Sequence, residues 1–387
     1  MTALADRHAS ADVLDLEIVV PVFNEEADLE PSVRRLHAYL RDELPLHAVI
    51  TIADNASTDG TLVAAHRLAR ELDGVSVLHL DAKGRGRALR AAWSASAAEA
   101  VCYMDVDLST DLRALLPLVA PLLSGHSDVA IGTRLAPGSR VVRGAKREVI
   151  SRSYNQILRT TLRARFSDAQ CGFKAVRSAA LPGLLDEVRD NGWFFDTELL
   201  VLAQRRGMRI HEVPVDWVDD PDSRVSIART AIDDLRGVAR LVAASPVARF
   251  MAVGVASTLA YALLYVLVHA FTGAQLANGL ALALTAVGNT AANRRLTFGV
   301  RGRAGLARQH LMGAVVFAIA LGLTTGALTL LEALVANPSR GLELAVLIPA
   351  STCATVTRYV ALRMWVFARP RTDRAPAELP VADRARC

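Results

Sequence analysis

Four long apolar runs fill the chain after residue 247, and they constrain its fold more than any other feature. They cover residues 250–271, 276–297, 311–335 and 342–367. Each is near the roughly 20 residues that a helix needs to cross a bilayer. Gly, Ala, Ser and Thr are frequent in them, as expected where helices pack closely in lipid. The mean hydropathy of +0.28 is also too high for a purely soluble enzyme. We therefore predict four transmembrane helices.

Arginines sort to one side of these runs. They precede the first run (Arg236, Arg240, Arg249), separate the second from the third (Arg294, Arg295, Arg301, Arg303, Arg308) and follow the fourth (Arg369, Arg371, Arg374). None lies between the first and second runs, and only Arg340 lies between the third and fourth. By the positive-inside rule, both termini then lie in the cytoplasm. We expect a multi-pass protein of the inner (cytoplasmic) membrane whose N-terminus is not a signal peptide.

Before residue 247, short apolar segments alternate with amphipathic ones. The apolar segments are rich in Val and Ile, which predicts buried strands over residues 17–22, 48–53, 75–80, 100–104 and 128–132. The intervening segments predict helices, such as 60–72, 86–98 and 111–123. This alternation predicts an α/β fold: a Rossmann-like, mainly parallel sheet with helices on both faces. The ligand site of such a sheet lies beyond the carboxyl ends of its strands.

Composition and pattern divide the chain into five segments. We expect a flexible N-terminus (1–15), an α/β domain (16–226), an amphipathic linker helix (227–247), a transmembrane domain (248–368) and a disordered tail (369–387). In the linker, one helical face carries Ile227, Ala231, Leu235, Val238 and Val242, and the other carries Arg229, Asp233, Arg236 and Arg240. A helix that closes a domain gives the same pattern, but the position before a membrane span favours a helix in the interfacial plane.

Charge and cysteine content exclude several classes of protein. A charged fraction of 21% beside 52% hydrophobic residues excludes a mainly disordered chain. The net charge of +5 is mild and suits a membrane surface or phosphorylated substrates as well as nucleic acid; of these partners we do not expect nucleic acid. Cys102, Cys171, Cys353 and Cys387 have neither zinc-ligand nor redox spacing.

A pair of carboxylates follows the predicted strand 100–104, in the sequence Asp105-Val106-Asp107. Two carboxylates placed where a strand opens into a loop can share a divalent cation with a diphosphate. Hard oxygen ligands suit Mg²⁺ or Mn²⁺. Such pairs are also common in solvated loops, so a functional role for this pair depends on the motifs at the neighbouring strand ends.

Further motifs follow the other predicted strands in order. They are Val20-Pro21-Val22-Phe23-Asn24-Glu25, Asp54-Asn55-Ala56-Ser57-Thr58-Asp59-Gly60-Thr61, Lys83-Gly84-Arg85-Gly86, Ile131-Gly132-Thr133-Arg134, Asp168-Ala169-Gln170-Cys171-Gly172-Phe173-Lys174 and Trp193-Phe194-Phe195-Asp196-Thr197-Glu198. Residues 16–240 thereby resemble the family 2 glycosyltransferases of the GT-A fold, and more narrowly the polyprenyl- or dolichyl-phosphate sugar synthases. Residues 249–367 resemble the four-span GtrA-like membrane domain.

The resemblance implies a role for each matching position. Asp105 and Asp107 would hold Mg²⁺ or Mn²⁺, and together with Arg134 and Arg147 they form the implied catalytic set. The implied nucleotide-sugar site comprises Pro21, Phe23, Glu25, Asp54, Asn55, Arg85, Val106 and Ser109. The implied acceptor-phosphate site comprises Arg134, Arg147, Arg224 and Arg358. Asn55 departs from the Asp often found in the family, and its amide leaves the identity of the base open.

The function that the resemblance implies is inverting, metal-dependent transfer of a hexose from a nucleotide sugar to polyprenyl phosphate. The segments 171–174 and 195–200 are more similar to the glucose-transferring branch, so UDP-glucose is the first choice of donor. GDP-mannose is the second, and a UDP-N-acetylhexosamine stays open. A competing interpretation is a translocase or anchor for lipid-linked sugars whose GT-A half only binds. The oligomeric state, a homo-oligomer included, stays open.

Several residues have structural alternatives. Asp168 and Glu198 fit helix caps or ion-pair partners at least as well as they fit a direct role in the chemistry. Trp193 and the two phenylalanines after it fit either core residues or a lip over the sugar or isoprenoid. Polar residues also lie at the predicted cytoplasmic ends of the second and fourth spans: Asn289, Asn293, Arg294, Arg358 and Arg363. Such groups are costly at membrane depth, so we expect contact with the lipid phosphate, with snorkelling to the interface as the alternative.

Overall fold

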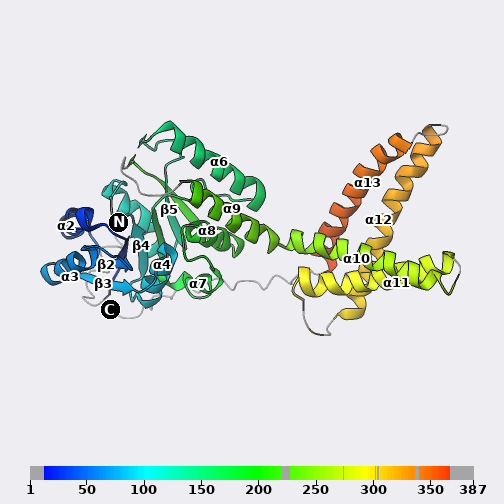
Figure 1. The fold of residues 1–387 in the computed structure, drawn as a ribbon, viewed down its shortest axis with the longest axis horizontal. Coiled ribbons are helices and arrows are strands. Elements are labelled where there is room, and N and C mark those ends of the chain that lie inside the picture. Colours follow the sequence, from blue (N-terminus) through cyan, green and yellow to red (C-terminus); the bar gives the residue numbers. More distant parts are fainter. Residues whose placement is uncertain are drawn as a thin grey trace, which may run out of the picture. The chain divides into compact units, whose positions relative to one another are not determined.

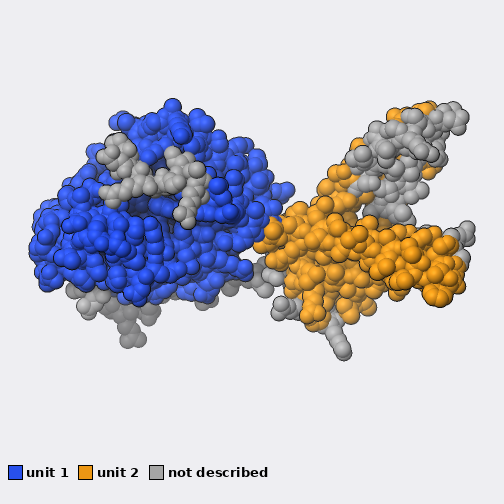
Figure 2. All heavy atoms as spheres, viewed as in Figure 1, with its two compact units in different colours: residues 1–242 blue, residues 243–387 orange. Residues whose placement is uncertain are grey.

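The computed structural model describes residues 13–219, 227–272, 274–300, 302, 305–335 and 340–366. The chain divides into two compact units, residues 1–242 and 243–387 (Figure 2). The predicted tail, most of the predicted flexible N-terminus and Arg224 lie outside the described residues. The five predicted segment boundaries stay a prediction.

The first unit is built on a seven-stranded sheet in the order β3-β2-β1-β4-β7-β5-β8. The strands are β1 (Leu16–Val22), β2 (Ala48–Asn55), β3 (Val75–Leu80), β4 (Ala100–Met104), β5 (Val129–Thr133), β7 (Phe173–Arg177) and β8 (Ile210–Pro214). Only β7 runs antiparallel to its neighbours, β4 and β5. A second, two-stranded sheet pairs β6 (Val141–Val142) with β9 (Trp217–Val218). The mainly parallel sheet is confirmed.

Helices cover both faces of this sheet (Figure 1). They are α2 (Glu26–Asp42), α3 (Thr61–Glu71), α4 (Arg85–Ala95), α5 (Leu115–Leu123), α6 (Ala145–Leu162), α7 (Leu184–Glu187), α8 (Phe195–Arg205) and α9 (Ile227–Ala243), with 3₁₀ turns η2 (Leu112–Ala114) and η3 (Ser178–Ala180). The helices predicted from periodicity over 60–72, 86–98 and 111–123 correspond to α3, α4 and η2 with α5.

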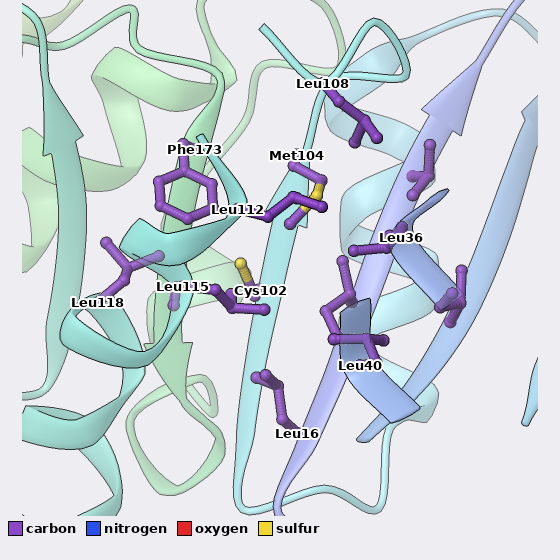
Figure 3. Close-up of a cluster of buried hydrophobic side chains, with 14 of the residues drawn as sticks. Leu16, Leu36, Leu40, Cys102, Met104, Leu108, Leu112, Leu115, Leu118 and Phe173 are labelled. Carbon is purple, nitrogen blue, oxygen red and sulfur yellow. The ribbon is translucent and has the colours of Figure 1, made fainter. Parts of the chain in front are cut away.

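Alternation along β1 divides the interior into two cores. Ile18 and Val20 face a cluster that includes residues of α2, α3 and α5, whereas Val19 faces a cluster that includes residues of α4, α6 and α8. Figure 3 shows part of the first cluster, where Leu36 and Leu40 of α2 lie near Leu16 of β1. Each fully buried leucine contributes about 1.5–3 kcal/mol. The two cores fix the sheet and therefore the loops at its edge.

Helix α9 packs on the second of these cores through a face that coincides only in part with its apolar stripe. Val238 of the stripe is buried, Leu235 is exposed, and the buried face also contains Asp234 and Leu241. The physical reason is Gly237, because a Cβ there would come within 2.4 Å of Phe194. The helix turns its glycine, rather than its widest apolar stripe, toward the domain. The expected position of this helix in the interfacial plane stays a prediction.

The second unit consists of helices over the four predicted apolar runs. They are α10 (Pro246–His269), α11 (Ala274–Ala292), α12 (Leu306–Leu334) and α13 (Arg340–Ala361), with π-helical segments η4 (Asn293–Thr297) and η5 (Leu362–Val366). Helix α10 packs along α11, and α12 along α13 (Figure 1). Among the described residues, α10 alone is both long and apolar enough to cross a membrane. The four-span topology stays a prediction.

Candidate active site at the carboxyl edge of the sheet

The parallel strands bring the predicted site residues to one edge. Val22 at the end of β1 is in register with Asp54 at the end of β2, and Met104 at the end of β4 pairs with Phe173 at the start of β7. Asp54, Asp105 and the backbone before β7 therefore belong to the same edge of the sheet. Arg134 also belongs there, because it follows β5, which runs parallel to β4.

Asp105 and Arg85 form the centre of this edge. Nη2 of Arg85 donates to Oδ1 of Asp105 at 2.7 Å. The guanidinium carbon lies 4.9 Å from the ring centre of Tyr103 and 4.8 Å from that of Trp193. Burial alone would lower the pKa of Arg85, but the nearby acidic groups, Asp105 foremost, together outweigh it and raise that pKa above its ordinary value. Burial raises the pKa of Asp105, against the opposing effect of Arg85.

A small pocket opens beside Asp105 and Asp107, and Ser109, Gly172 and Trp217 also line it. The backbone N–H of Ser109 donates to Oδ1 of Asp107 at 3.0 Å. Among the described residues, no three His, Cys, Asp or Glu side chains are placed to hold a metal ion. Two carboxylates nevertheless fit Mg²⁺, or the similarly hard Mn²⁺, at a phosphate-handling site, because such an ion takes its remaining ligands from substrate phosphates and water.

A buried polar network lies behind Asp105. Nζ of Lys174 donates to the Tyr103 hydroxyl at 3.1 Å and to the Cys171 carbonyl, and it lies 3.2 Å from Oδ1 of Asp196. The Tyr103 hydroxyl donates to the same Asp196 oxygen. Burial, reinforced by the charge of Asp196, holds the pKa of Tyr103 well above its usual range. No role for Lys174 was predicted from the sequence, where its signals are its place at the end of the motif 168–174 and its position at the start of an apolar strand.

Two buried acceptors lie at the end of β2. Oδ2 of Asp54 accepts a hydrogen bond from Nδ1 of His79 at 2.7 Å. Oδ1 of Asp54 and Oδ1 of Asn55 are buried and have no hydrogen-bond partner in the described part of the chain. Because an unsatisfied buried acceptor is costly, these atoms indicate a ligand with N–H or O–H donors. No sequence pattern indicated His79, which meets Asp54 only through the pairing of β2 with β3.

The loop after β1 is bound to the loop after β2. The backbone N–H of Asn24 donates to Ser57 Oγ at 3.0 Å, and that of Glu25 donates to Thr61 Oγ1 at 2.8 Å. Nζ of Lys83 lies 3.4 Å from the ring centre of Phe23. Pro21 is half-buried within β1. The structure thus gathers the predicted nucleotide-site residues of β1 and β2, while their contacts with a nucleotide stay a prediction.

Two of the arginines predicted to bind the acceptor phosphate, Arg134 and Arg147, have carboxylate partners. Arg134 forms a two-point ion pair with fully buried Asp168, with Nε–Oδ2 at 2.8 Å and Nη2–Oδ1 at 3.0 Å. Burial would raise the pKa of Asp168, but Arg134 outweighs it and lowers that pKa. Nη1 of Arg147 lies 2.7 Å from Oδ2 of Asp219. Asp168 is therefore an ion-pair partner, and the phosphate-binding roles of Arg134 and Arg147 stay predictions.

The segment 193–198 divides between core and surface, and the alternative of a lip over the sugar or isoprenoid stays a prediction for Trp193. Phe194 and Phe195 are buried core residues, whereas Trp193 is 47% exposed. Oε2 of Glu198 accepts hydrogen bonds from the backbone N–H of Asp190 at 2.7 Å and from Nη2 of Arg240 on α9 at 3.0 Å. Glu198 thus ties the loop before Trp193 to α9.

A mainly parallel sheet with paired carboxylates after a central strand defines a GT-A type nucleotide-sugar fold. The glycosyl transferase family 2 model matches residues 17–184, and the GtrA/DPMS transmembrane domain model matches residues 249–367. An undecaprenyl-phosphate mannosyltransferase of Micrococcus luteus is 31% identical over 207 residues, which cover 52% of this chain and 82% of that protein. The chain belongs to glycosyl transferase family 2 and carries a GtrA/DPMS transmembrane domain.

Two further relatives are similar to the same part of the chain. Glycosyltransferase AglD of Haloferax volcanii is 41% identical over 223 residues, which are 57% of this chain but 36% of that protein. The chain therefore spans about a third of the length of this relative. A dolichyl-phosphate beta-glucosyltransferase of Saccharomyces cerevisiae is 24% identical over 249 residues, covering 59% of this chain and 74% of that protein.

Proposed function

We propose that this chain transfers a hexose from a nucleotide diphosphate sugar to polyprenyl phosphate at the cytoplasmic face of a membrane, with inversion at the anomeric carbon. The first choice of donor is UDP-glucose. The observation that carries the proposal is the donor or acceptor character of the buried atoms at the sheet edge that have no hydrogen-bond partner among the described residues. Oδ1 of Asp54 and Oδ1 of Asn55 are acceptors, and Nε of Arg85, beside Asp105, is a donor.

This arrangement matches the parts of a nucleotide diphosphate. A nucleobase and a ribose bring N–H and O–H donors, which Asp54 and Asn55 accept. A diphosphate brings only acceptor oxygens and negative charge, which Arg85 complements. Asp105 and Asp107 would hold Mg²⁺ or Mn²⁺, and the bound ion stabilises the charge that develops on the leaving diphosphate.

The acceptor needs orientation rather than deprotonation. A phosphate monoester has its second pKa near 6 and is largely dianionic at neutral pH, so its oxygen attacks without a general base. As the new bond forms at the anomeric carbon, the bond to the β-phosphate oxygen breaks and the nucleoside diphosphate leaves. In-line attack on an α-linked donor gives a β-linked product. Arg134 and Arg147 are the proposed groups that orient the acceptor phosphate, since planar guanidinium groups suit phosphate oxygens.

The choice between donors rests on two relatives. The yeast relative is a dolichyl-phosphate beta-glucosyltransferase, which supports UDP-glucose. The Micrococcus relative is an undecaprenyl-phosphate mannosyltransferase, which supports GDP-mannose as the alternative.

The test is sugar transfer by the purified full chain in liposomes. Radiolabelled UDP-glucose, GDP-mannose and UDP-N-acetylhexosamines are offered in turn with polyprenyl phosphate and Mg²⁺ or Mn²⁺. We expect lipid-extractable label from one donor, lost with EDTA and in the Asp107→Ala variant. Nucleotide binding without a lipid product from any donor would overturn the proposal and favour a translocase or anchor.

A further inference from the structure

A polar cluster joins three helices inside the second unit. Nδ2 of Asn289 on α11 donates to Oγ of Ser257 on α10 at 2.8 Å, and Nδ2 of Asn293 donates to Oδ1 of Asn289 at 2.8 Å. Oγ1 of Thr297 donates to Oδ1 of Asn293 at 2.9 Å. Arg358 on α13 donates through Nη2 to Oδ1 of Asn289. We refer to these five residues as the amide–arginine cluster.

This cluster places a positive charge among neutral groups. Asn293 is fully buried, and Asn289 and Thr297 are each 5% exposed. The amide of Asn289 satisfies one N–H of Arg358, but an amide cannot neutralise a guanidinium charge. A charge removed from water without a counter-charge is costly, and this holds strongly at membrane depth.

In the described part of this unit, no carboxylate lies at this end of the helices. Between residues 243 and 366 the sequence contains two acids, Glu332 and Glu343. Glu343 precedes Arg358 by fifteen positions on α13, which is roughly 22 Å along the helix axis. Glu332 is near the end of α12, next to the short connection that leads into α13. Both acids therefore occupy helix positions at the opposite end from Arg358.

A second arginine repeats the same pattern. Arg294 is 8% exposed, and its Nε donates to Oε1 of Gln309 at 2.6 Å. Its Nη2 donates to the carbonyl of Gly302. These partners are also neutral, so this membrane unit holds two largely enclosed arginines whose described partners carry no charge.

We propose that the amide–arginine cluster binds the phosphate group of a lipid-linked phosphate. The phosphate supplies the missing negative charge, and its oxygens accept from the guanidinium N–H groups that Asn289 does not occupy. The naming of the lipid as polyprenyl phosphate rests on the proposed function. The cluster is built from residues of the membrane unit alone.

The test measures binding of undecaprenyl phosphate to the full chain in detergent, with undecaprenol as the lipid without phosphate and inorganic phosphate as competitor. We expect Arg358→Gln to weaken binding of the phosphate lipid about tenfold and to leave undecaprenol binding unchanged. The matched control is Arg295→Gln, because Arg295 is exposed in η4 of the same unit. Wild-type affinity in Arg358→Gln would overturn the proposal.

A second variant keeps the test informative if Arg358→Gln folds poorly. Asn289→Asp puts a carboxylate against Arg358, so it preserves the contact, neutralises the charge and repels phosphate. We expect this variant to elute as wild type and to lose the phosphate-dependent binding; retained binding would contradict the proposal. Displacement of the lipid by equimolar inorganic phosphate would overturn the assignment of the amide–arginine cluster as a site for a lipid-linked phosphate. UDP binding, measured in the same samples, tests the nucleotide site of the proposed function independently of the amide–arginine cluster.

Discussion

Gly172 and Asp105 approach so closely that a Cβ on Gly172 would lie 1.7 Å from Oδ2 of Asp105. Gly172 immediately precedes β7, the strand that runs antiparallel to β4, and its carbonyl accepts from the backbone N–H of Asp105 at 3.3 Å. The antiparallel strand therefore brings bare backbone against the proposed metal-binding carboxylate. Only glycine leaves that carboxylate in its place.

Gly172→Ala should therefore displace Asp105 and lower sugar transfer. Because a shift of about 1 Å at a reacting centre can cost on the order of 100-fold in rate, we expect a loss of that size. Transfer is measured at saturating donor, with thermal unfolding as the check on folding. The matched control is Gly144→Ala, since a Cβ at Gly144 has no described neighbour within 4 Å. Equal rates in the two variants would contradict the role of Gly172.

The residues after β2 and β4 could be placed from the sequence for a simple reason. Runs of Val and Ile identify the parallel strands, and the carboxyl ends of parallel strands meet at one edge. Asp54 and Asp105 were therefore expected together without knowledge of strand order. Their actual partners, His79 and Arg85, follow from side-chain geometry that a one-dimensional pattern does not contain.

The residues that the sequence missed depend on long-range packing. Lys174 acquires its network only because β7 is inserted antiparallel beside β4, and the alternation of strands and helices does not predict that insertion. Helical periodicity identifies the apolar stripe of α9 but does not show which part of the helix packs on the domain, because it gives no weight to Gly237. In the structure, close approach to Phe194 favours the glycine.

His79→Ala should weaken nucleotide binding. The His79 ring holds Oδ2 of Asp54 and leaves Oδ1 for the ligand. Loss of the His79 side chain therefore lets the Asp54 carboxylate rotate. We expect the Kd for UDP to rise about tenfold, as for loss of one charged hydrogen bond. Calorimetry on the full chain measures this, and His66→Ala at an exposed position is the control. An unchanged Kd for UDP would show that Asp54 needs no support from His79.

Lys174→Met should destabilise the first unit strongly. The substitution leaves the Asp196 carboxylate buried beside the Tyr103 hydroxyl without its cation. Removing one partner of a buried ion pair costs about 3–5 kcal/mol. By contrast, Arg41→Met breaks an exposed pair with Asp42 and should change the stability very little. Denaturant unfolding followed by tryptophan fluorescence compares the two, and equal losses would contradict the argument.

Asp234 couples the docking of α9 to pH. Its side chain is buried on α9 and accepts from Nε2 of Gln170 at 2.8 Å. Burial, with the nearby charges of Asp190 and Asp196, raises its pKa from an ordinary 3.8 to about 7. The docked helix therefore binds a proton that the unfolded chain has already released between about pH 4 and 7. Docking is favoured at low pH and weakens as pH rises through 7.

Asp234→Asn should remove this pH dependence, because an amide keeps the hydrogen bond to Gln170 and carries no charge. We expect α9 of the wild type to exchange amide hydrogens faster at pH 8 than at pH 6, after correction for intrinsic rates, and α9 of the variant to be equally protected at both. At pH 8 the variant should be more stable by on the order of 1–2 kcal/mol. Asp233→Asn is the matched control, since Asp233 is exposed and contacts Arg236 on the outer face. Loss of the pH dependence in Asp233→Asn, or its persistence in Asp234→Asn, would assign the effect to another group.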